Sequence, residues 1–284
     1  MGEALLLHPF PACVLRSNFR GNTPSKLLLA CGSGHNGSTI LARVLLDHPA
    51  IGGELSETFV FGLTPERSWP AVFEQLSMQA NNPAWLLEKT PLHIFNASRL
   101  LEIFPSARCL CLIRDGKEVV ASMVLRSYSV KTATQRWVSS AQETLLLRSL
   151  YPSRSILVRY EDLVSSQIES LTRIAGFLGI RSAPLLKAAS STANTSYLGH
   201  NIDSFMVRSR YPSHNLVDFD LPHDMRRATQ AALPLEQAGA PRWKEIEHSQ
   251  RQYVLSNDDF VLYSKIFGYL PWSQNLHGLD PSSH

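Results

Sequence analysis

The segment Lys26–Asp47, KLLLACGSGHNGSTILARVLLD, decides the fold. It begins with the short apolar run Lys26–Cys31, and apolar residues recur at helical spacing from Thr39 to Asp47. A glycine-rich loop lies between them. The order strand, loop and helix leaves backbone N–H groups exposed at the helix start, where the helix dipole adds partial positive charge. The segment therefore predicts a phosphate site, with a glycine-rich turn that binds nothing as the alternative.

An apolar run followed by a helical segment occurs twice more. Arg108–Ile113 precedes a helix predicted at Lys117–Arg126, and Ser155–Tyr160 precedes one at Ile168–Leu178. Further helices are predicted at Trp85–Leu101, Thr134–Leu150 and Asp224–Ala238. Strands that alternate with helices predict the α/β class, here a P-loop-like parallel sheet flanked by helices on both faces. In such sheets ligands bind at the carboxyl ends of the strands.

The composition is that of one globular domain. With 284 residues, 44% of them hydrophobic and 18% charged, the chain can bury a sizeable core, so we expect a single domain over 1–284. Residues 26–180 form its predicted nucleotide-binding core, and the polar, turn-rich stretch 190–213 is predicted to be a lid or an acceptor segment. The formal net charge of +3 is too small to suggest a nucleic-acid partner.

Neither a membrane nor a metal is indicated. No stretch approaches the roughly 20 apolar residues that span a bilayer, and Met1–Leu15 lacks the basic region of a signal peptide. The four cysteines form no Cys-x-x-Cys pattern, and Cys109 and Cys111, two apart on a predicted strand, lie too far apart to pair. We expect reduced thiols, no metal, no membrane partner and a cytoplasmic location.

The glycine loop differs from a nucleotide triphosphate loop at one position. Gly32, Gly37 and Thr39 fit the spacing of that loop, but Ser38 stands where its lysine belongs. Without this cation for the β- and γ-phosphates, a kinase or triphosphatase is disfavoured. The residues expected to contact the ligand here are Gly34, His35, Asn36, Gly37, Ser38 and Thr39.

A second anion site is predicted after the run Arg108–Ile113. Arg114 ends this strand, and Ser122 and Arg126 lie four apart on the helix predicted next, so all three can reach one spot. Two guanidinium groups and a hydroxyl suit a terminal phosphate, because arginine binds phosphate oxygens with paired hydrogen bonds. The alternative is solvated surface arginines and an ordinary helix serine.

The two sites together resemble the PAPS-dependent sulfotransferase family, which uses 3′-phosphoadenosine 5′-phosphosulfate (PAPS). The resemblance rests on GSGHNGSTIL (32–41), EKTP (88–91), LIRDGKEVVASMVLR (112–126) and VRYEDLV (158–164), and is closest to the protein-tyrosine and bacterial branches. It implies that the loop binds the 5′-phosphosulfate and that Arg114 and Ser122 bind the 3′-phosphate. Arg126, Tyr160 and, on a thinner match, Ser209 are expected to contact the same co-substrate.

The resemblance also implies four candidates for the chemistry. His35 stands where many family members carry lysine or arginine, so an imidazolium is expected to stabilise the leaving phosphate, with activity falling as pH rises past its pKa. Lys89 is expected to supply a permanent positive charge. The acceptor's base is either Glu54 or Glu57; alignment does not choose between them, and Glu57 is slightly favoured.

The expected activity is transfer of a sulfuryl group from PAPS to a hydroxyl or amine, with release of adenosine 3′,5′-bisphosphate (PAP). The acceptor is a small molecule, a carbohydrate or a peptide, and the sequence does not specify which. It also leaves the oligomeric state open. The alternatives are a small-molecule or nucleoside kinase with a degenerate phosphate loop, and a non-catalytic nucleotide-binding protein.

Overall fold

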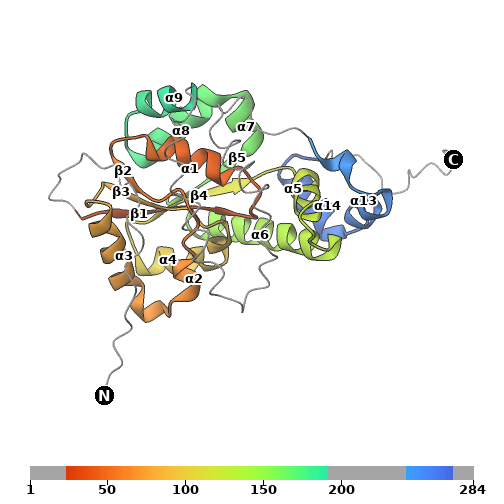
Figure 1. The fold of residues 1–284 in the computed structure, drawn as a ribbon, viewed down its shortest axis with the longest axis horizontal. Helices are drawn as coiled ribbons and strands as arrows, with labels where there is room; N and C mark the ends of the chain where they lie inside the picture. Colours follow the sequence, from red (N-terminus) through yellow and green to blue (C-terminus); the bar gives the residue numbers. More distant parts are fainter. Residues whose placement is uncertain (1–23, 191–240, 271–284) are drawn as a thin grey trace, which may run out of the picture.

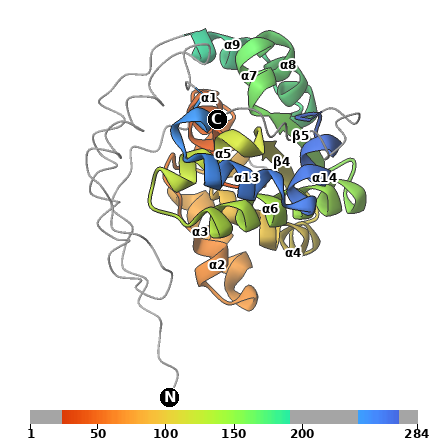
Figure 2. The ribbon, with the colours of Figure 1, turned by 90° about the vertical axis from the view of Figure 1, so that its right-hand side faces the viewer.

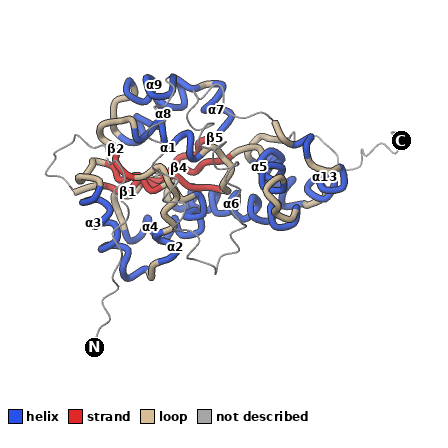
Figure 3. Tube along the Cα trace, viewed as in Figure 1, coloured by secondary structure: helices blue, strands red, loops and turns tan. Residues whose placement is uncertain are grey.

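The computed structural model describes residues 24–190 and 241–270, which build a parallel sheet covered by helices on both faces. The five strands run in the order β2-β3-β1-β4-β5 and pair in parallel throughout. Their bounds are β1 Lys26–Gly32, β2 Ile51–Gly53, β3 Trp85–Glu88, β4 Arg108–Ile113 and β5 Ser155–Arg159. The predicted α/β class is confirmed, and Figure 3 shows the strands enclosed by helices.

The central strands are apolar because both of their faces are buried. In β1 every residue after Lys26 is buried, and in β4 every residue after Arg108. Cys109 and Cys111 lie on β4 as buried free thiols, and Cys31 on β1 is a third. Burial raises the pKa of Cys109 well above its ordinary value, so this thiol is held protonated in the core.

Helices form one layer on each side of the sheet (Figures 1 and 2). The α-helices described are α1 Ser38–Leu46, α2 Val60–Leu63, α3 Trp69–Gln79, α4 Ala97–Ile103, α5 Gly116–Val124, α6 Val130–Leu150, α7 Tyr160–Ser165, α8 Gln167–Leu178, α9 Ala183–Ser190, α13 His248–Leu255 and α14 Asp258–Ile266. Helices α1, α8 and α9 pack on one face, and α3, α4 and α6 on the other. No helix in residues 24–190 or 241–270 is long and apolar enough to cross a membrane.

The helix predicted at Trp85–Leu101 is wrong in its first half. Trp85–Glu88 is strand β3, a short 3₁₀ helix follows at Pro91–Asn96, and only α4 continues the predicted helix. Thr90 precedes a proline and is extended, with φ −117° and ψ 107°, so the chain cannot run helically through this point. A short apolar run buried on both faces does not reveal its own period, which explains the error.

The helix predicted at Lys117–Arg126 ends earlier than expected. Helix α5 stops at Val124, and the chain turns at Ser127, whose φ of 67° is left-handed. The N–H groups of Ser127 and Tyr128 donate to the carbonyls of Val124 and Met123, which closes the helix end. Arg126 therefore lies in the turn directly after α5 and not on the helix itself.

The segment 241–270 supports α5 and α6. The ring of Phe260 on α14 packs against Trp137 on α6, with ring centroids 4.8 Å apart. Both rings press on Gly116, where an added Cβ would lie 2.6 Å from Phe260 Cε2. This packing fixes the start of the helix that carries Ser122. The predicted helix Asp224–Ala238, the residues 191–213 of the predicted lid segment, and Cys13 lie outside the described residues.

Candidate functional site

The glycine loop connects β1 to α1 at the carboxyl edge of the sheet. Gly37, at the start of α1, has φ 86°, and a Cβ there would lie 2.4 Å from Cδ2 of Tyr160. Only glycine satisfies both the left-handed backbone and this close approach. Gly34 and His35 are also left-handed, with φ 74° and 53°. The loop therefore curls tightly before the helix, as an anion-binding loop requires.

The side chain of Asn36 connects the glycine loop to the sheet. Its side chain is fully buried, Nδ2 donates to the carbonyl of Leu112 on β4 at 3.2 Å, and Oδ1 accepts from the Ser38 N–H at 3.3 Å. These bonds occupy the amide group and tie the loop to the central sheet. The side chain of Asn36 is thus structural, and the predicted contact of Asn36 with a ligand would be made by its backbone.

Arg114, Ser122 and Arg126 come together around His35, two of them at its imidazole and Arg114 at its backbone carbonyl. His35 Nδ1 lies 2.8 Å from Ser122 Oγ, and Arg126 Nη1 lies 3.2 Å from His35 Nε2. Arg114 Nη1 donates to the His35 carbonyl at 3.4 Å. The structure thus brings the three predicted residues together, and His35 is a fourth member of the cluster that spacing did not place there; the binding of a phosphate by this cluster stays a prediction.

The contacts of His35 define which of its nitrogens carries the proton. A guanidinium only donates, so Nε2, facing Arg126, accepts and is unprotonated. Nδ1 then carries the hydrogen and donates to Ser122 Oγ. If Nδ1 donates, the serine oxygen accepts this bond and its own hydroxyl hydrogen can point toward a ligand. This arrangement fits a neutral ring, and the imidazolium expected from the sequence stays a prediction.

Tyr160 joins this cluster to the loop. Its ring packs on Gly37, and the Arg114 guanidinium carbon lies 4.3 Å from the ring centroid. Burial raises the pKa of the Tyr160 hydroxyl, with Arg114 opposing the shift. The Tyr160 side chain therefore lies between the glycine loop and Arg114 and contacts both.

A second cluster lies at the start of α1. Lys89, whose side chain is only 3% exposed, places Nζ 3.5 Å from Thr39 Oγ1 and 3.6 Å from Glu57 Oε1. Removing an ammonium group from water costs several kcal/mol, which a nearby carboxylate partly offsets. Lys89 thus brings a positive charge to the loop and links it to one of the two candidate bases.

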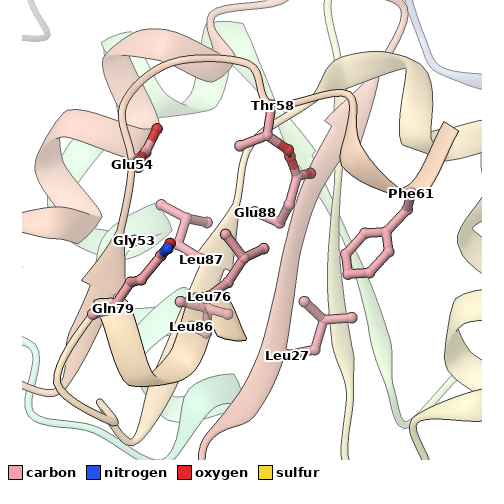
Figure 4. Close-up of a pocket in the computed structure, with 11 residues that line it drawn as sticks. Leu27, Gly53, Glu54, Thr58, Phe61, Leu76, Gln79, Leu86, Leu87 and Glu88 are labelled. Atoms are coloured by element: carbon pink, nitrogen blue, oxygen red, sulfur yellow. The ribbon is translucent and has the colours of Figure 1, made fainter. Parts of the chain in front are cut away.

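Glu54, the other candidate base, lies outside the cluster of Lys89, Thr39 and Glu57. Its carboxylate accepts a hydrogen bond from Ser56 Oγ at 2.9 Å and borders a cavity of about 20 Å³, which Figure 4 shows with Thr58 and Glu88 on its far side. Burial raises the pKa of Glu54, the Ser56 hydrogen bond opposes the shift, and the charge of Glu88 adds to it. The cavity is large enough for one water molecule and too small for an acceptor.

The sequence interpretation missed one member of the site, Glu88. Its carboxylate is 2% exposed and accepts hydrogen bonds from Thr58 Oγ1 at 2.7 Å and from Thr90 Oγ1 at 2.6 Å. The only available signal was its place in the segment EKTP, next to Lys89. Ser209 lies outside the described residues. Within residues 24–190 and 241–270 no group of His, Cys, Asp and Glu side chains is arranged to hold a metal ion.

Comparisons of sequence match parts of this chain to sulfotransferases. The model of the sulfotransferase family matches residues 61–184. The protein-tyrosine sulfotransferase of Drosophila melanogaster is 30% identical over 105 residues, which are 34% of this chain and 21% of that protein. Protein-tyrosine sulfotransferase 2 of Gallus gallus is 27% identical over 119 residues, 38% of this chain and 32% of that protein. The matched segments thus span about a fifth to a third of these relatives.

Comparisons of structure agree on the fold. The sulfotransferase domain of the Synechococcus PCC 7002 olefin synthase superposes with a TM-score of 0.52 at 21% identity, covering 89% of this chain and 98% of that one. A sulfotransferase domain from the curacin biosynthetic pathway gives 0.51 at 16% identity, covering 88% and 99%. The family match, the partial relatives and the shared P-loop-like sheet agree with one another: residues 61–184 match the sulfotransferase family, and the fold is that of sulfotransferase domains.

Proposed function

We propose that the protein transfers a sulfuryl group from PAPS to a hydroxyl or amine of a small-molecule, carbohydrate or peptide acceptor and releases PAP. One observation carries the proposal: two clusters suited to anions are held at a fixed separation by Tyr160, which touches Gly37 and Arg114. A donor with phosphate groups at both its 5′ and 3′ positions matches such a pair of clusters. A nucleoside triphosphate carries no terminal phosphate on the 3′ side.

In this proposal the donor spans both clusters. The 5′-phosphosulfate lies against the backbone N–H groups of the loop and the hydroxyl of Thr39, where the start of α1 favours negative charge. The 3′-phosphate lies against Arg114, Ser122 and Arg126, which supply guanidinium forks and an available hydroxyl hydrogen. Lys89 provides the cation that Ser38 does not, from the residue directly after β3 instead of from the loop.

The transfer is an in-line displacement. Glu57 accepts the proton of the acceptor hydroxyl or amine, and the acceptor atom forms a bond to sulfur. The bond between sulfur and the bridging phosphate oxygen breaks, and its electron pair leaves with PAP. Lys89 and the loop N–H groups stabilise the charge that develops on the departing oxygen. Glu57 is preferred to Glu54 because it pairs with Lys89, which in turn contacts Thr39.

The test is release of PAP from PAPS in the presence of a panel of phenols, amines, sugars and tyrosine peptides. Release that depends on one acceptor class and needs no magnesium would support the proposal. Tight PAP binding without release across the panel would favour the non-catalytic alternative. Consumption of ATP with magnesium would favour the kinase.

His35 is expected to act on the 3′ side of the donor. His35→Asn keeps a residue that tolerates the left-handed backbone but is too short to reach Arg126. PAP affinity should fall about tenfold, equivalent to ~1.4 kcal/mol, because Ser122 and Arg126 lose the ring that orients them. Affinity for adenosine 5′-phosphosulfate, which lacks the 3′-phosphate, should stay within about twofold. Isothermal titration with both nucleotides measures the difference.

The opposite pattern would return His35 to the role expected from the sequence. A loss of turnover with unchanged PAP affinity would place the ring at the bridging oxygen. Tighter PAP binding by the variant would show that the imidazole competes with the phosphate for Ser122 and Arg126. Either result contradicts the orienting role.

A further inference from the structure

One buried carboxylate, that of Glu88, anchors the loop that carries Glu57. Thr58, the next residue, donates from Oγ1 to Glu88 Oε1 at 2.7 Å, and Figure 4 shows the two side chains meeting beside the cavity. The N–H of Phe59 donates to Thr90 Oγ1 at 3.1 Å. That hydroxyl in turn donates to Glu88 Oε1 at 2.6 Å. Both residues after Glu57 thus depend on the same carboxylate.

The remaining contacts of Glu88 fix its own position. Its Oε2 accepts from the Thr90 N–H at 3.0 Å and lies 3.4 Å from His93 Nε2. The carboxylate sits at the end of β3, 2% exposed, where an ionised group must be satisfied by its neighbours. Hydrogen bonds from Thr58 and Thr90 meet that need, so a shift of the loop would leave a buried charge less well bonded.

The strain in the loop shows why such support is needed. Phe59 is left-handed, with φ 55°, a conformation that bulky residues rarely adopt. Thr58 Oγ1 also accepts from the Val60 N–H at 3.1 Å, so one hydroxyl links the start of α2 to Glu88. The neighbouring Lys89 contacts Glu57 directly at 3.6 Å. Two consecutive residues therefore hold Glu57 in place. Lys89 contacts its carboxylate, and Glu88 at the end of β3 holds the backbone that follows it.

We propose that Glu88, acting through Thr58 and Thr90, is a positioning residue that holds Glu57 at the acceptor side of the site. The role rests on the proposed function, in which Glu57 is the base. Glu88 itself touches neither donor nor acceptor.

The experiment is a double-mutant cycle on kcat between Thr58→Val and Glu57→Gln, measured with enzyme in excess of PAPS. Valine keeps the branched shape of threonine and removes the hydroxyl that reaches Glu88. In the wild-type background Thr58→Val should lower kcat about tenfold with PAP affinity unchanged. In the Glu57→Gln background it should lower kcat less than about twofold, because there is no base left to misplace.

Matched variants separate positioning from a loss of stability. Thr58→Ser retains the hydroxyl and should restore kcat to within about twofold of wild type. Thr134→Val removes a more deeply buried hydroxyl, which donates to the Val130 carbonyl in α6 at 2.7 Å, and should leave kcat unchanged. Glu88→Gln should reproduce the kcat loss of Thr58→Val, and a thermal shift with PAP confirms that each variant is folded.

If Thr58→Val lowered kcat by the same factor in the wild-type and Glu57→Gln backgrounds, the positioning role would be overturned. Wild-type kcat in the Thr58→Val variant would overturn it as well. A wild-type protein that binds PAP but never turns over PAPS is a different failure. It would remove the proposed function, and this role with it, before any variant is compared.

Discussion

Glu57→Gln is expected to lower turnover of PAPS by about 10²–10⁴-fold, the usual contribution of a general base, while PAP still binds. The amide keeps the size of the side chain and loses the ability to accept the acceptor's proton. Glu57 Oε1 lies 3.6 Å from Lys89 Nζ, which lies 3.5 Å from Thr39 Oγ1, so the carboxylate is connected to the loop where the donor is proposed to bind. Rapid-quench measurement of PAP formation gives the rate.

Glu54→Gln is the matched control, because it makes the same change in the same loop. Glu54 bonds to Ser56 and has no described contact with Lys89 or Thr39, so turnover should stay within about threefold of wild type. A large loss from Glu54→Gln with a small one from Glu57→Gln would reverse the assignment. Full turnover in both variants would place the base outside this loop.

Lys89→Met is expected to lower kcat by about 10²–10³-fold, the range found when one stabilising donor of a developing anion is removed. Methionine matches the length of the side chain and carries no charge. The ammonium is 3% exposed, and water screens a charge so deeply buried far less than one at the surface. Its removal also takes away the ion-pair partner of Glu57. Single-turnover kinetics at saturating PAPS isolates this effect from binding.

Lys187→Met on α9 makes the same chemical change at an exposed position and should leave kcat unaltered. If Lys89→Met changed only the affinity for PAPS, the lysine would stabilise bound PAPS in the ground state and would not stabilise the transition state further. A kcat within about threefold of wild type would remove Lys89 from the chemistry.

The strands that precede the two predicted anion sites could be predicted from the sequence, and the strand that precedes Lys89 could not. Lys26–Cys31, Arg108–Ile113 and Ser155–Tyr160 were predicted as strands and match β1, β4 and β5 within one residue at each end. Each precedes a glycine or polar turn and a clear helix, so its length and flanks reveal its type. β3 is four residues long and buried throughout, and it runs into a proline-containing turn that resembles a helix start.

Part of the candidate site could likewise be predicted from the sequence, and part of it could not. The sequence could place Arg114, Ser122 and Arg126 near one another because they follow in order through one strand, one helix and the turn after it, although Arg126 lies in the turn and not on the helix. The position of His35 depends on the left-handed turn of the loop and on a partner 87 positions along the chain, which no local pattern encodes. The role of Glu88 depends on Thr58, 30 positions away. Such contacts across the edge of the sheet can be recognised only when the order of the strands in the sheet is known.

The most direct test of the account is thermal stabilisation by PAP measured in parallel with ATP and magnesium. A ligand at about 100 times its Kd should add roughly 2.7 kcal/mol to the stability of the folded protein. We expect this stabilisation with PAP alone, and we expect its loss in Arg114→Ala, because that substitution removes the guanidinium proposed to bind the 3′-phosphate and its packing on the Tyr160 ring. Stabilisation by ATP with magnesium and none by PAP would contradict the donor site and favour a kinase.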